Sequence, residues 1–78
     1  MVLSVRRETG GRGGQTGTTV TGLGFEDAQL RAMAALLKRR CGTGGTVKEG
    51  IIEIQGDRVD LLLRELEAQG YRVKKSGG

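Results

Sequence analysis

Two segments of the chain, 26–40 and 57–70, repeat apolar residues at the spacing of an α-helix. The apolar positions are Leu30, Met33, Ala34, Leu37 and Cys41 in the first, and Val59, Leu62, Leu63 and Leu66 in the second. Residues three or four apart lie on one face of a helix. We therefore predict two amphipathic helices, with Leu61 off the buried face of the second and exposed.

The predicted helix ends carry charges and glycines that suit them. Acids at residues 26–27 open the first helix and the cations of residues 38–40 close it, which complements the helix dipole. Gly42 can adopt the left-handed conformation that follows a helix. Asp57 is the expected N-cap of the second helix, with Asp60 completing an approximate capping box, and Gly70 ends that helix.

The remaining apolar residues alternate with polar ones, as in strands with one buried face. The predicted strands are residues 1–6, 18–21, a hairpin of Val47 with residues 51–54 around Glu49–Gly50, and residues 71–75. Between the first two strands, residues 7–17 contain five glycines and no apolar side chain. This composition predicts a hairpin with a long, mobile tip.

The order β-β-α-β-β-α-β indicates an α+β fold, a two-layer α/β sandwich. A mostly antiparallel sheet with both helices on one face would bury the two apolar stripes together. The other face of the sheet would then carry Arg6, Thr19, Glu53, Arg72 and Lys74. We expect one domain over residues 1–75, followed by a short flexible tail at residues 76–78.

Composition narrows the class of protein. A chain of 78 residues with two aromatic side chains, Phe25 and Tyr71, must build a small aliphatic core. One cysteine cannot form an internal disulfide and suits a reducing compartment. No apolar run is long enough for a membrane span or a signal peptide, so a cytoplasmic protein without membrane contact is expected.

Positive charge is clustered rather than spread. The net charge is +4, and the cations gather at Arg6, Arg7 and Arg12, at residues 38–40 with Lys48, and at residues 72–75. Such clusters favour a polyanionic partner. The alternative, that these cations only keep a small domain soluble, stays open.

The side chains needed for catalysis are largely missing. The chain has no histidine, so the commonest general base at neutral pH is absent and Cys41 has none to activate it. A single cysteine cannot build a structural zinc site. The glycines around Lys48 do not have the spacing of a phosphate-binding loop, and we interpret Gly42, Gly44 and Gly45 mainly as a tight helix-to-strand connection. Close approach of their backbone amides to an RNA phosphate stays open as a second role. The sequence predicts neither an enzyme nor a bound cofactor or metal.

The glycine-rich hairpin suits an RNA backbone, because guanidinium groups fork onto phosphates and glycine follows irregular surfaces. The sheet lacks the aromatic residues that stack bases in other RNA-binding sheets. Recognition by shape and phosphate contact is therefore expected. A merely solvated loop is the alternative.

The run from Lys38 to Gly50 reads Lys-Arg-Arg-Cys-Gly-Thr-Gly-Gly-Thr-Val-Lys-Glu-Gly, and residues 54–57 read Ile-Gln-Gly-Asp. These segments resemble the core signature of the eukaryotic translation initiation factor 1 family and its bacterial and archaeal homologues, basic-Cys-Gly-x-Gly-Gly-Thr-Val-Lys-x-Gly followed by Ile-Gln-Gly-Asp. Residues 7–22 also align without gaps with shorter prokaryotic homologues, whose hairpin reads Arg-x-Thr-x-Gly-Arg-Lys-Gly-Lys. Gly13 and Gln15 depart from that pattern, since homologues often carry lysine there.

The resemblance implies a translation initiation factor, or a regulator derived from one, that binds the small ribosomal subunit near the peptidyl site without nucleotide or metal. It would influence start-codon or initiator-tRNA selection there. Ribosomal RNA is the expected partner, with initiator tRNA and mRNA as further partners of a monomeric protein. The residues expected at this interface are Arg6, Arg7, Arg12, Gln15, Lys38, Arg39, Arg40 and Lys48.

Two other functions stay open on the sequence alone. A protein-interaction module would dock a partner on the second helix around Leu61, and its basic loops would be incidental. A generic RNA-binding protein would use the open face of the sheet.

Overall fold

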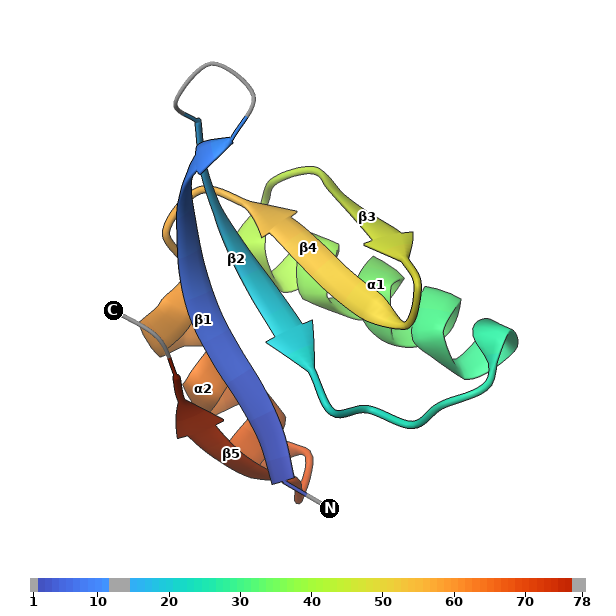
Figure 1. The fold of residues 1–78 in the computed structure, drawn as a ribbon. Coiled ribbons are helices and arrows are strands. Elements are labelled where there is room, and N and C mark those ends of the chain that lie inside the picture. The colour runs from blue at the N-terminus through green and yellow to red at the C-terminus, as the bar shows by residue number, and fades with distance from the viewer. Residues whose placement is uncertain (1, 12–14, 77–78) are drawn as a thin grey trace.

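The computed structural model describes residues 2–11 and 15–76 and confirms the predicted order of elements (Figure 1). These are β1 (Val2–Gly11), β2 (Gln15–Thr21), α1 (Asp27–Cys41), β3 (Gly45–Lys48), β4 (Ile51–Gln55), α2 (Val59–Ala68) and β5 (Arg72–Lys75). The strands form one sheet in the order β3-β4-β2-β1-β5. All neighbours are antiparallel except β1 and β5. Both helices lie behind the sheet in Figure 1, so the two-layer α+β arrangement is confirmed.

The core lies between the sheet and the helices and is aliphatic, as predicted. Its buried apolar side chains are Leu3, Val5, Val20, Leu23, Leu30, Met33, Ala34, Leu37, Ile52, Ile54, Val59, Leu62 and Leu66. Leu23 joins this core from the connection between β2 and α1, where no periodic pattern signals burial. Leu63, expected to be buried, is only partly buried beside the core, and Leu61, expected to be exposed, is half-buried.

The first hairpin differs from its prediction. β1 continues past Arg6 to Gly11, and β2 begins at Gln15 instead of Thr18. Glu8 pairs with Gly17 and Gly11 with Gln15, with an irregular register between the two pairs. Backbone pairing needs no apolar side chain, so the absence of apolar residues did not end the strands. Most of the predicted mobile tip is therefore strand, and its residues 12–14 lie outside the described residues.

The start of α2 also differs from its prediction. Asp57 is not the N-cap: α2 begins at Val59, Arg58 occupies the cap position, and no side-chain capping bond is formed. The Asp57 carboxylate accepts only a long hydrogen bond of 3.5 Å from the Val59 N–H. The hydroxyl of Thr18 accepts the Arg58 N–H instead, at 2.8 Å. A tertiary contact therefore replaced the local cap.

Two predicted turns are confirmed by backbone geometry. Gly42 ends α1 in the left-handed conformation, with φ 68°. The β3–β4 turn places both Glu49 and Gly50 at positive φ, 53° and 78°, which matches the right-handed twist of the flanking strands. Beyond β5, the Ser76 N–H donates to the Val5 carbonyl at 2.9 Å.

Candidate nucleic-acid interface

The last turn of α1 presents three consecutive cations at one end of the molecule. Arg39 and Arg40 are exposed and Lys38 is half-buried, and their charges compensate the partial negative charge of the helix C-terminus. Arg40 Nε lies 2.7 Å from Oε1 of Glu65 on α2. The described ion pairs include none for Lys38 or Arg39, so these two side chains are available to a partner.

Backbone hydrogen bonds bring two loops and the first hairpin to the same end. The Gln55 N–H donates to the Gly44 carbonyl at 3.0 Å, and the Gly56 N–H donates to the Thr16 carbonyl at 2.9 Å. The end of α1, the turn before α2 and the outer part of the first hairpin therefore meet there (Figure 1). We call this region the basic end, and define it by Arg7, Lys38, Arg39, Arg40 and Arg58.

Thr18 holds the turn before α2 in place. It is fully buried, and its hydroxyl donates to the Gly56 carbonyl at 2.7 Å while accepting the Arg58 N–H. The adjacent Asp57 carboxylate lies 3.7 Å from the Arg7 guanidinium. A buried hydroxyl with both partners satisfied is a fixed point, so this turn positions Arg58 on the surface.

Arg58 was missed by the sequence analysis, which assigned its neighbourhood only to helix capping. Its side chain is exposed. Burial is the main reason that the pKa of the Cys41 thiol lies above its usual value; the nearby charge of Arg58 lowers this pKa and that of Glu65 raises it, both by less than burial. Cys41 packs beside the core, which agrees with a structural role and not with a nucleophile. The sequence did contain a signal for Arg58 as an interface residue, because it is a cation directly after the Ile-Gln-Gly-Asp motif.

The glycines that connect α1 to β3, including Gly45 as the first residue of β3, serve different purposes. Gly42 needs its positive φ, and a Cβ at Gly45 would overlap the carbonyl oxygen of Glu53. At Gly44 a Cβ would meet only the Gln55 side chain, 3.4 Å away, in ordinary contact. The predicted structural role of this loop is therefore supported at Gly42 and Gly45, whereas Gly44 is not required by the fold.

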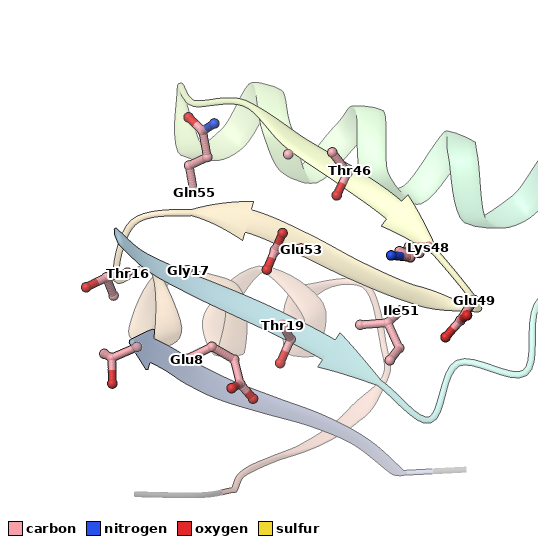
Figure 2. A pocket seen from close by; sticks show the side chains of 12 residues that line it. Glu8, Thr16, Gly17, Thr19, Thr46, Lys48, Glu49, Ile51, Glu53 and Gln55 are labelled. Carbon is pink, nitrogen blue, oxygen red and sulfur yellow. The ribbon is translucent and has the colours of Figure 1, made fainter. Parts of the chain in front are cut away.

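The predicted interface residues do not form one patch. Lys48 lies at the far end of β3 on the open face (Figure 2). Arg6 is exposed next to the buried Val5 on β1, so it points to the same open face, with its Nε 3.2 Å from Oε1 of Glu8. Gln15 begins β2 and pairs with Gly11 through the backbone. Arg12 lies outside the described residues. The basic end thus combines Arg7 and residues 38–40 with Arg58, and leaves Arg6 and Lys48 on another surface.

Other kinds of site find little support in the described part of the chain. Within residues 2–11 and 15–76, no group of three or more histidine, cysteine, aspartate or glutamate side chains could hold a metal ion. None of the helices described there is long and apolar enough to cross a membrane.

Comparison with known proteins places the chain in a family. Residues 2–72 match the model of the family described as "Translation initiation factor SUI1". An uncharacterized protein YciH of Escherichia coli is 51% identical over 77 residues, which cover 99% of this chain and 71% of the relative. A protein translation factor SUI1 homolog of Methanothermobacter thermautotrophicus is 36% identical over 70 residues, covering 90% of this chain and 65% of the relative.

These matches agree with the resemblance found in the sequence signature. The matched family consists of translation factors and is not an enzyme family, which confirms the expectation of a protein without catalytic activity. The chain belongs to the SUI1 family of translation initiation factors.

Proposed function

We propose that this protein binds the small ribosomal subunit through its basic end and there influences start-codon or initiator-tRNA selection. The observation that carries the proposal is the convergence of Lys38, Arg39 and Arg58 at one end, beside the Asp57-bound Arg7. Family membership supports it, because the matched family is one of translation initiation factors. The protein would act in the cytoplasm as a monomer without cofactor, with ribosomal RNA as its first partner and initiator tRNA and mRNA nearby.

The chemistry of the basic end suits RNA phosphates. Arginine presents a planar fork that matches two phosphate oxygens, and lysine offers a mobile point charge. Thr18 fixes the backbone of Arg58, so the backbone there needs no ordering when a phosphate arrives, and only the exposed side chain loses conformational entropy. Arg12 and Gln15 would extend the contact from the tip of the first hairpin, and Arg6 and Lys48 would approach RNA only from the open face.

A matched pair of triple variants tests the proposal by co-sedimentation with purified small subunits over a range of salt. Lys38→Ala/Arg39→Ala/Arg58→Ala removes three cations of the basic end and keeps Arg40, whose partner Glu65 is 19% exposed. The control variant, Arg72→Ala/Lys74→Ala/Lys75→Ala, removes three exposed cations from β5, which is the edge strand of the sheet opposite β3.

The first variant should flatten the plot of log affinity against log salt by about 0.7–0.9 for each phosphate that it no longer neutralises. The control should bind with nearly the wild-type slope. Equal reductions of the slope in both variants would mean that only net charge matters, and no binding by the wild-type protein would refute the proposal itself.

The protein-docking alternative rests on Leu61, which borders a shallow hollow beside Arg64 and Ala68 on α2. Leu61 is half-buried, so it offers less apolar surface than the sequence predicted. The basic end is the better supported site.

A further inference from the structure

The open face of the sheet carries a hollow of about 480 Å³ over β2 and β4 (Figure 2). Gly17 forms part of its floor, with Glu53 and Gln55 beside it. A Cβ at Gly17 would lie 3.5 Å from the Ile54 carbonyl oxygen and 3.6 Å from Oε2 of Glu53, which are ordinary contacts. The fold therefore does not require glycine at this position, and the missing side chain keeps the floor open.

The lining of the hollow is acidic in a protein that is basic as a whole. It contains Glu8, Glu49 and Glu53 but only one cation, Lys48, so its formal charge is −2 (three acids and one base), against +4 for the chain. Glu8 is paired with Arg6 at 3.2 Å. The lining of the hollow and the basic end thus have opposite formal charge, although the cations Arg6, Arg72 and Lys74 also lie on the open face around the hollow.

Glu53 is the central group of the hollow. It stands in one cross-strand row with Thr19 on β2 and Thr46 on β3, which flank it on either side (Figure 2). Its side chain is half-buried, and among the residues that the structure describes no ion pair or side-chain hydrogen bond involves its carboxylate. A carboxylate without such a partner gains most from a cation that also donates hydrogen bonds.

We propose that this hollow receives an arginine side chain from a basic protein segment of the small subunit, an inference that rests on the proposed function and names a second, protein partner. The guanidinium would donate to Glu53 and to the hydroxyls of Thr19 and Thr46, while its aliphatic stem would lie over Gly17 in the next cross-strand row. An RNA phosphate is disfavoured there because like charges repel across the lining.

A pair of charge reversals separates this contact from general attraction to RNA. Glu53→Lys and Glu67→Lys change the net charge equally, and Glu67 is exposed on α2 away from the hollow. If only RNA attraction mattered, both variants would bind small subunits more tightly. We expect Glu53→Lys to bind about tenfold more weakly than Glu67→Lys, the scale of one hydrogen-bonded charge contact. Equal or tighter binding by Glu53→Lys would overturn the inference.

Glu53→Gln guards against a folding artefact, because it keeps the size of the side chain and removes only its charge. This variant should melt at the wild-type temperature and still bind more weakly than wild type. Wild-type affinity in Glu53→Gln would also overturn the inference.

A second experiment uses the free protein and no ribosome. Titration with N-acetylarginine amide should shift the amide NMR signals of Gly17, Thr46, Glu53 and Gln55 in a saturable way. The neutral isostere N-acetylcitrulline amide should not, and Glu53→Gln should abolish the effect. Equal shifts at the exposed acids of α2 would refute the arginine site, because any surface carboxylate would then serve. Shifts with guanosine, a nucleoside of RNA, but not with the arginine amide would refute it as well.

The two experiments fail separately. Binding of the arginine amide without binding to small subunits would refute the proposed function and the ribosomal source of the arginine, but would support the arginine site itself. Ribosome binding without any response of the hollow would refute this inference alone.

Discussion

The covered and open faces of the sheet are made from the same strands, with alternate residues pointing to each. On β4, Ile52 and Ile54 are fully buried against the helices, whereas Ile51 is 38% exposed on the open face and Glu53 lies beside it. The covered face excludes water and stabilises the fold. The open face contributes little apolar burial and is free to carry charge. Along each strand, residues that stabilise the fold therefore alternate with residues that are free to contact a partner, and substitutions of adjacent residues can test this difference.

The largest effect is expected at the adjacent isoleucines of β4. Ile52→Ala should lower the free energy of unfolding by about 2–5 kcal/mol, because it leaves a cavity in a fully buried site. Ile51→Ala should cost less than about 1 kcal/mol, since its side chain already contacts solvent. Urea denaturation followed by circular dichroism measures both values. Similar destabilisation at the two positions would show that the open face is also part of the core.

A smaller effect is expected at the adjacent threonines of β2. Thr18→Val keeps the shape of the side chain but leaves the Arg58 N–H and the Gly56 carbonyl without their partner, which should cost about 1–3 kcal/mol. Thr19→Val removes only an exposed, 3.5 Å hydrogen bond to the Arg6 carbonyl and should change stability by less than about 0.5 kcal/mol.

The same pair also tests the basic end. Thr18→Val should weaken binding to small subunits beyond its effect on folding, measured at a temperature where both variants are folded. Unchanged binding would mean that Thr18 stabilises the fold without positioning Arg58.

The last comparison concerns Gly44 and Gly45 at the start of β3, and it includes the smallest expected effect. Gly45→Ala should cost about 1–3 kcal/mol because the new Cβ meets backbone atoms of β4. Gly44→Ala should be neutral or stabilise by up to about 1 kcal/mol, since it restricts the unfolded chain and meets only the Gln55 side chain. Thermal melting of the two variants and wild type gives the comparison. A marked destabilisation in Gly44→Ala would assign this glycine a structural role as well.

Local patterns in the sequence were enough for most of the fold. The apolar spacing placed α1 within one residue of its ends, and Gly42 and the Glu49–Gly50 turn were recognisable from their residue types. Periodicity works here because each helix or strand buries one face, and the spacing of that face is a property of the local backbone. The family signature in residues 38–57 was equally readable, since it is contiguous in the chain.

Contacts between distant residues decided the rest. The extension of the first hairpin came from backbone pairing that leaves no mark on side-chain pattern, and Leu23 became buried only through the path of its loop. At the start of α2, the Arg58 N–H is accepted by the hydroxyl of Thr18, which lies 40 residues away in sequence, and the predicted cap by Asp57 is not formed. The same tertiary arrangement divided the predicted cations between the basic end and the open face, because strand order and the direction of β3 carry Lys48 away from Lys38. The sequence by itself determined which elements form and which sides they bury; only their packing decided which charged groups meet.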